Sequence, residues 1–137
     1  MNTMLVEQIV IANRLDELRR MTAWLHGSAK AMGVGKDTLF KLDLCANEAV
    51  ANIVSHAYSD DHRHDIILEL HQDAENTSLV IRDDGVPFNP LDMPEHEVPR
   101  GLAEAGIGGL GVHLIRKLAT RCRYQRVNGL NVLSLEV

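Results

Sequence analysis

The chain has 137 residues and a mass of 15.2 kDa. This is the usual size of one domain, so we expect residues 1–137 to form a single domain. Hydrophobic residues make up 45% of the chain and charged residues 24%, which excludes a disordered or low-complexity protein. Acidic residues outnumber basic ones by 19 to 14, and the net charge of -5 argues against nucleic acid as a partner.

The cysteines and the N-terminal residues indicate where the protein works. Two cysteines far apart in sequence, Cys45 and Cys122, make neither a disulfide framework nor a zinc site, which fits a reducing compartment. The first residues lack the pattern of a signal peptide, and no stretch approaches the roughly 18 apolar residues that span a bilayer. We therefore expect a cytoplasmic protein that does not bind membranes.

Three elements are predicted in the first half of the chain. Residues 4–11 are short and rich in aliphatic types, which favours a strand. Residues 14–31 carry leucine and alanine at helical spacing, and Gly33 supplies a stop. Residues 37–57 carry a wide apolar stripe and predict the longest helix.

The second half predicts two hairpins separated by a long loop and a helix. Alternating residues at 66–70 and 79–81 predict the first hairpin. Residues 84–109 are rich in proline and glycine without periodicity, which is typical of a functional loop. Helical spacing returns at 110–119, and Asn128-Gly129 then predicts a type I′ turn between strands 121–127 and 130–137.

The clustering of the helices predicts the fold class. Helices that follow one another, rather than alternate with strands, favour an α+β two-layer sandwich. We expect one mixed, mainly antiparallel sheet with helices on one face.

The second predicted helix carries a candidate catalytic pair. Glu48 and Asn52 are four residues apart, so they share one helical face one turn apart. An Asn oxygen suits a partly hydrated Mg²⁺ site at a phosphate, and a nearby Glu accepts a proton from an attacking hydroxyl or water. By itself the pattern is more typical of a solvated helix face.

The end of the second hairpin strand carries a candidate recognition group. If Leu79 and Ile81 face the core, Asp83 also points inward, because side chains alternate along a strand. A buried carboxylate needs a structural donor or a ligand N–H group such as an exocyclic amine. Gly85 lets a flat ligand approach the backbone. The alternative is a turn in which Asp83 caps local N–H groups.

A glycine-rich segment, Gly106-Ile-Gly-Gly-Leu-Gly111, leads into the last predicted helix. Free N–H groups at a helix N-terminus bind phosphate oxygens, so this segment predicts a lid over a triphosphate. It matches neither a Walker A loop nor a dinucleotide fingerprint. The alternative is a flexible linker whose glycines bind nothing.

Together and in this order, the segments EAVAN, DDGVPF and GIGGLG resemble the N box, the D-x-G box and the glycine-rich lid of the GHKL ATPase superfamily. The longer segments around these motifs, LCANEAVANIVSHAY, DDGVPFNP and GGLGVHLIRKLA, are most similar to the small anti-sigma-factor serine kinases. The resemblance covers nearly the whole chain and implies the histidine-kinase-like ATPase fold.

The resemblance also implies roles for single residues. Glu48 is then the base for the attacking serine hydroxyl, Asn52 the Mg²⁺ ligand, and Asp83 the acceptor for the adenine amino group, with Gly85 lining the adenine pocket. The implied residues around the phosphates are Gly108, Gly109, Leu110, Gly111 and, as a candidate γ-phosphate contact, Arg100.

The sequence departs from the family pattern at Asp84, where many relatives carry Asn. Two adjacent carboxylates near a triphosphate are expected to weaken nucleotide binding unless the metal or a lid cation offsets them.

Three functions are compatible with these motifs. The resemblance favours a kinase that uses ATP and Mg²⁺ to phosphorylate an anti-anti-sigma protein of the STAS type, sequesters a sigma factor, and forms a homodimer. The second candidate is a nucleotide-gated module that sequesters a partner without catalysis. The third, the ATPase part of a sensor histidine kinase, is disfavoured because no phosphoacceptor box of the H-E-x-x-x-P kind surrounds any histidine.

Other side chains have simpler interpretations. His62 and His64 lack a third clustered ligand and are interpreted as a solvated loop. The aromatic residues are interpreted as core and pocket wall rather than a platform for stacking bases. They are Trp24, Phe40, Tyr58, Phe88 and Tyr124.

Overall fold

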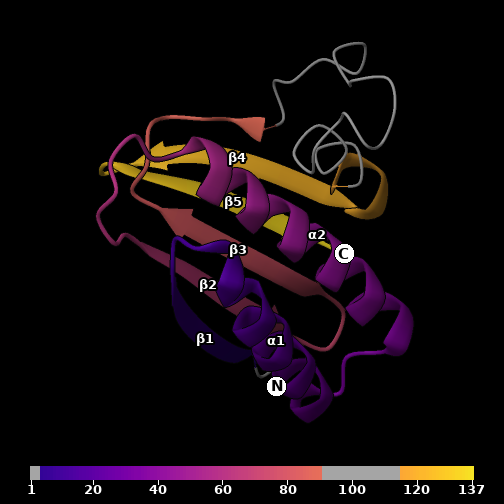
Figure 1. Cartoon of the computed structure of the whole chain (residues 1–137). Coiled ribbons are helices and arrows are strands. Elements are labelled where there is room, and N and C mark those ends of the chain that lie inside the picture. Colours follow the sequence, from indigo (N-terminus) through magenta and orange to yellow (C-terminus); the bar gives the residue numbers. More distant parts are fainter. Residues whose placement is uncertain (1–3, 91–114) are drawn as a thin grey trace, which may run out of the picture.

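A computed structural model describes residues 4–90 and 115–137 as a five-stranded sheet with two long helices (Figure 1). The strand order is β1-β2-β3-β5-β4. The strands are β1 (Leu5–Ala12), β2 (Asp65–Gln72), β3 (Thr77–Asp83), β4 (Arg121–Val127) and β5 (Leu130–Glu136). The helices are η1 (Leu15–Glu17), α1 (Leu18–Met32) and α2 (Lys36–His56).

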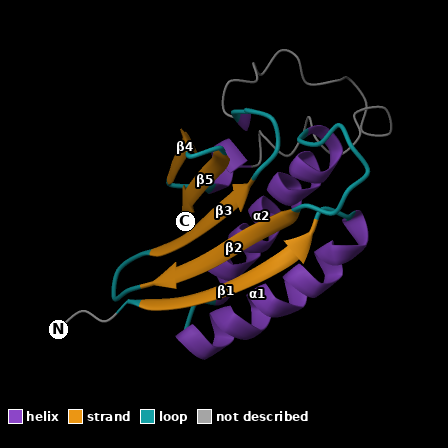
Figure 2. Ribbon diagram, turned by 90° about the vertical axis from the view of Figure 1, so that its left-hand side faces the viewer, coloured by secondary structure: helices purple, strands orange, loops and turns teal. Residues whose placement is uncertain are grey.

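Both long helices cover the same face of the sheet (Figure 2), which confirms the predicted two-layer α+β sandwich. The core lies between the two layers. Every other residue of β2 and β3 is buried against the helices, as the alternation predicts. The largest fully buried side chains of this core are Ile11, Met21, Leu25, Leu42, Ile66, Leu68, Leu70, Leu79, Ile81 and Leu135.

The sheet differs from the prediction in one respect. All four strand pairings among the described residues are antiparallel, so this sheet is not mixed. The two hairpins and the return of β5 to β3 explain this arrangement, because in each case the two neighbouring strands run in opposite directions.

The helices begin and end close to the predicted positions. Gly33 ends α1 in the left-handed conformation with φ 79°, and its N–H bonds to the carbonyls of Ala29 and Lys30. The first predicted turn is a 3-10 helix, η1, instead of α-helix. Here the Glu17 carboxylate accepts from the backbone N–H of Ala12 at 2.8 Å and ties the end of β1 to this turn.

The turns of both hairpins follow from local chemistry. In the first, Asp73 Oδ1 accepts from the backbone N–H groups of Glu75 and Asn76 at 2.8 and 2.7 Å. In the second, Asn128 and Gly129 have φ values of 51° and 80°, which confirms the predicted turn with two left-handed residues.

Residues 115–118 are helical, and Ile115 is fully buried. Residues 110–114 of the predicted 110–119 helix lie outside the described residues, and residue 119 already follows the helix. Within the described ranges, none of the helices has the length and apolar character needed to cross a membrane.

Candidate functional site

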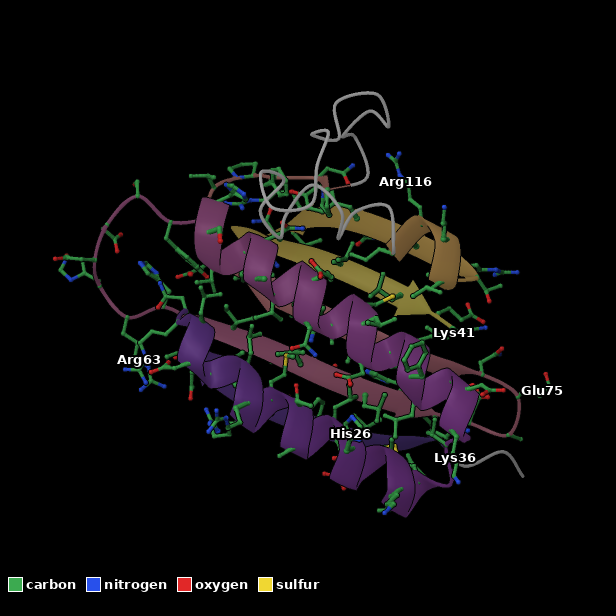
Figure 3. The ribbon with its side chains drawn as sticks, turned by 45° about the vertical axis from the view of Figure 1, so that its right-hand side comes forward. His26, Lys36, Lys41, Arg63, Glu75 and Arg116 are labelled. Carbon is green, nitrogen blue, oxygen red and sulfur yellow. The ribbon has the colours of Figure 1, made fainter. Side chains whose placement is uncertain are left out.

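A pocket lies where the C-terminal half of α2 meets the ends of β3 and β5. Small side chains of α2 leave room beside the sheet, and polar side chains enter from both layers. The pocket is lined by Ala49, Asn52, Ile53, Ala57, Asp83, Phe88, Pro90, Tyr124, Asn131 and Leu133. To place the pocket in Figure 3, Arg63 lies just before β2 at this end of the molecule, and Lys36 and Glu75 lie at the opposite end. An apolar wall with a few convergent polar groups is typical of a small-molecule site.

Asp83 points inward, as the strand alternation predicts, and it is 4% exposed. Its Oδ1 accepts from Asn131 Nδ2 and from the Gly85 backbone N–H, both at 2.9 Å. Burial raises the pKa of the Asp83 carboxyl, and these two hydrogen bonds act in the opposite direction. The turn-capping alternative is thus partly present, while Asp83 still lines the pocket.

Asn131 is a site residue that the sequence analysis missed. It faces Asp83 across the β3–β5 pairing and is 5% exposed. Its Nδ2 also donates to the Val86 carbonyl at 2.8 Å, and its Oδ1 accepts from Tyr124 Oη and the Phe88 N–H. The alternation that identified Asp83 also applies here, because Leu133 and Leu135 place Asn131 on the buried face of β5.

Gly85 is required by a close contact with helix α2. A Cβ at this position would lie 2.4 Å from Ala57 Cβ and 2.6 Å from the Ala57 carbonyl oxygen. The neighbouring Val86 N–H donates to that same carbonyl at 2.9 Å. The glycine therefore lets the loop after β3 dock on the end of α2, next to the pocket.

We expect Gly85→Ala to lower the free energy of unfolding by about 1–3 kcal/mol, because the backbone must move away from Ala57. Urea denaturation of the variant and the wild type measures this difference. Gly27→Ala is the control, since a Cβ at Gly27 would meet nothing within 4 Å. Equal stability of the Gly85→Ala variant and the wild type would contradict the packing role.

Glu48 and Asn52 both carry buried polar atoms without a protein partner. Glu48 Oε2 and Asn52 Nδ2 make no hydrogen bond in the part of the chain that the structure describes. Asn52 is 4% exposed, and burial raises the pKa of the half-buried Glu48 carboxyl. Unpaired buried polar groups are costly, and of the two residues Asn52 lines the pocket, one helical turn from Glu48. The solvated-face alternative is wrong for this pair.

The family model of the histidine kinase-like ATPase domain matches residues 11–137. The chain belongs to the histidine kinase-like ATPase family. An ATP site is therefore expected in this fold, and the pocket beside α2 contains both Asn52 and Asp83.

Several proteins similar to this chain are named as protein kinases. The serine/threonine-protein kinase BtrW of Bordetella bronchiseptica is 41% identical over 96 residues, which cover 70% of this chain and 68% of that protein. The serine-protein kinase RsbW of Bacillus licheniformis is 30% identical over 116 residues, and that of Bacillus subtilis is 26% identical over 112 residues. Each of these two matches covers 79% of this chain and 70% of the relative.

The residues present fit a magnesium ion held largely by phosphates. No group of three His, Cys, Asp or Glu side chains in the described ranges is arranged to hold a metal. Mg²⁺ at nucleotide sites commonly takes only one or two protein ligands and completes its shell with phosphate oxygens and water. A single amide oxygen such as Asn52 Oδ1 is compatible with this arrangement, whereas the unpartnered Nδ2 is a hydrogen-bond donor and supplies no metal ligand.

The lid motif of the histidine kinase-like ATPase family falls outside the described residues. The positions concerned are Arg100, Gly108, Gly109, Leu110 and Gly111. Their contacts with phosphates stay a prediction.

Two simple interpretations from the sequence are confirmed only in part. His62 is exposed in its loop, as predicted, whereas the side chain of His64 is 20% exposed and lies between Asp60 and Asp84. Phe40 is not in the core or the pocket wall, because it is 64% exposed on α2. The other aromatic interpretation is confirmed for Phe88 and Tyr124, which line the pocket.

Proposed function

We propose that this chain is an ATP-dependent protein serine kinase that acts in a sigma-factor partner switch. It phosphorylates an anti-anti-sigma protein of the STAS type and sequesters a sigma factor when that antagonist is unavailable. The observation that carries the proposal is the pair of unpartnered buried atoms on Glu48 and Asn52, beside a pocket that also contains Asp83. The kinase names of the relatives and the family match over residues 11–137 support it.

Each site residue has a distinct role in this proposal. Asp83 accepts a hydrogen bond from the adenine amino group and fixes the base in the pocket. Asn131 keeps the Asp83 carboxylate in place through the 2.9 Å hydrogen bond. Asn52 would hold Mg²⁺ at the phosphates, and the bound ion would supply charge stabilisation there.

Glu48 acts on the nucleophile. The serine oxygen forms a bond to the γ-phosphorus, the bond from that phosphorus to the bridging oxygen of ADP breaks, and the serine proton passes to the Glu48 carboxylate. The pKa of Glu48 is raised by burial, which makes the carboxylate a stronger base. Positioning and charge stabilisation supply most of the remaining catalysis. The lid residues named above complete the phosphate site in this proposal.

The proposal also includes the broader expectations from the sequence. Residues 1–137 form one ATPase domain, and the single family match from 11 to 137 supports this. The protein works as a homodimer in the cytoplasm, where ATP and Mg²⁺ are supplied.

A transfer assay tests the proposed function. The purified chain is incubated with Mg-ATP and each serine-containing STAS-type protein of the same organism, and mass spectrometry locates any added phosphate. We expect one of these proteins to gain phosphate on a serine only when the chain and ATP are both present. Stable complexes without phosphate transfer would overturn the kinase and favour a nucleotide-gated module that only sequesters its partner.

A further inference from the structure

His64 connects the loops that follow α2 and β3, next in sequence to the pocket residues Ala57 and Asp83. Its Nε2 lies 2.8 Å from Asp60 Oδ1, in the loop that follows α2. Its Nδ1 lies 3.2 Å from Asp84 Oδ1 and 3.4 Å from Asp84 Oδ2, in the loop that follows β3. Tyr58 stacks on the imidazole, with ring centroids 4.3 Å apart and an interplanar angle of 19°.

The contacts on both ring nitrogens require a charged histidine. A carboxylate only accepts hydrogen bonds, and a neutral imidazole has a single N–H group. The imidazole donates to Asp60 and to Asp84 at the same time only when Nδ1 and Nε2 each carry a proton. On loss of one proton, the longer contact to Asp84 is the one we expect to break.

The other groups near the ring do not replace this connection. Arg63 and Asp65 pair with each other at 3.3 Å. Asn13, after β1, exchanges hydrogen bonds with the backbone of His64. His62 contributes its backbone N–H to Asp60, and burial raises the pKa of the Tyr58 phenol, which therefore stays neutral. Asp60 and Asp84 are thus the charged groups in contact with the imidazole in the described part of the chain.

The residue that His64 holds belongs to the nucleotide-binding loop. Asp84 stands between Asp83, in the pocket, and Gly85, which docks on Ala57. Half of the Asp84 side chain is exposed; the His64 contact ties it to Asp60, and Tyr58, which stacks on the same imidazole, also hydrogen-bonds to Asp84. A released Asp84 adds a second mobile carboxylate next to Asp83, at a site proposed to bind a polyanion.

We propose that His64 is a positioning residue for nucleotide binding: in its charged form it ties Asp84 to Asp60, and in its neutral form it releases Asp84 and weakens binding. This inference rests on the nucleotide-binding part of the proposed function. The apparent dissociation constant rises as the fraction of molecules with the tied loop falls.

The sign of the pH dependence follows from the two carboxylates. The hydrogen bond with Asp60, the larger influence, and that with Asp84 raise the pKa of His64 above its ordinary value. The connection is therefore complete below the ordinary histidine pKa and is lost as the pH rises through the raised value. Nucleotide affinity is expected to fall over that window.

Calorimetric titration with ADP between about pH 6 and about pH 8.5 tests the proposal. For the wild type we expect the dissociation constant to rise by about two- to five-fold across this range, as for loss of one partly exposed ion pair. His64→Gln should bind ADP at every pH as weakly as the wild type does at high pH. Asp84→Asn should bind ADP at every pH as tightly as the wild type does at low pH. Neither variant should show the pH dependence. His62→Gln, in the same loop, should follow the wild type. A wild-type pH profile in either the His64 or the Asp84 variant would overturn the proposal.

A second measurement separates this proposal from the proposed function. NMR titration of the His64 imidazole needs no nucleotide, and its pKa should fall in Asp84→Asn relative to the wild type. An unchanged His64 pKa in Asp84→Asn overturns the connection itself, whatever the nucleotide does. Absence of ADP binding at every pH overturns the proposed function, and with it the role of His64 in binding.

Discussion

We expect Glu48→Gln to slow phosphate transfer from ATP by about 10²- to 10⁴-fold while ADP binding stays within a few-fold of wild type. Glutamine keeps the size and polarity of the side chain but has no basic oxygen for the serine proton. The buried Oε2 of Glu48 has no protein partner in the described part of the chain, so the substitution breaks no structural hydrogen bond of that atom. Single-turnover transfer to the antagonist protein measures the rate, and calorimetry measures ADP binding.

The control for this variant is Glu75→Gln. Glu75 lies in the β2–β3 turn, at the end of the molecule away from Arg63 (Figure 3). The Glu75→Gln variant should transfer phosphate at the wild-type rate. Transfer by Glu48→Gln at the wild-type rate would rule out Glu48 as the base.

The second large effect is expected for Asp83→Asn, which should weaken ADP binding by about ten- to a hundred-fold, the usual value of a hydrogen bond to a charged group. A carboxylate accepts hydrogen bonds on both oxygens, and Asp83 uses Oδ1 for Asn131 and Gly85. An amide has one acceptor oxygen. The amide that replaces the carboxylate therefore turns its own N–H group toward either the Asn131 amide or the adenine amino group. Both of these are donors, so the two N–H groups repel each other.

Calorimetric titration of ADP into the Asp83→Asn variant measures the loss, and a melting curve without nucleotide confirms that the variant is folded. Asp37→Asn, in the first turn of α2 and away from the pocket, is the matched control. Its affinity for ADP should be unchanged. Full affinity in Asp83→Asn would show that this carboxylate does not recognise the base.

Local sequence patterns predicted the elements and one inward side chain because each depends on neighbouring residues alone. The period-2 alternation of Leu79 and Ile81 placed Asp83 on the buried face, and the structure confirms it. Asn128-Gly129 predicted its turn because both positions need a left-handed backbone. The predicted mixed sheet was wrong because strand direction depends on how β5 returns to β3, which is a pairing between distant segments.

The parts of the site that the sequence did not predict are contacts between distant segments. Asn131 meets Asp83 across 48 residues, and His64 meets Asp84 across 20. Each looks ordinary in its own segment, a polar residue after a turn and a histidine in a loop. Gly85 was expected to admit a ligand, whereas its described contact is with Ala57. Motif spacing cannot express such contacts, because the fold brings the two partners together.

The most direct test of the nucleotide site is an NMR titration of the ¹⁵N-labelled wild-type protein with ADP and Mg²⁺. We expect saturable shifts of the backbone or side-chain amides of Asn52, Asp83, Gly85 and Asn131, while Glu75 at the opposite end stays unchanged. Saturable shifts confined to other surfaces, or none at any ADP concentration, would contradict a nucleotide pocket between α2 and the ends of β3 and β5.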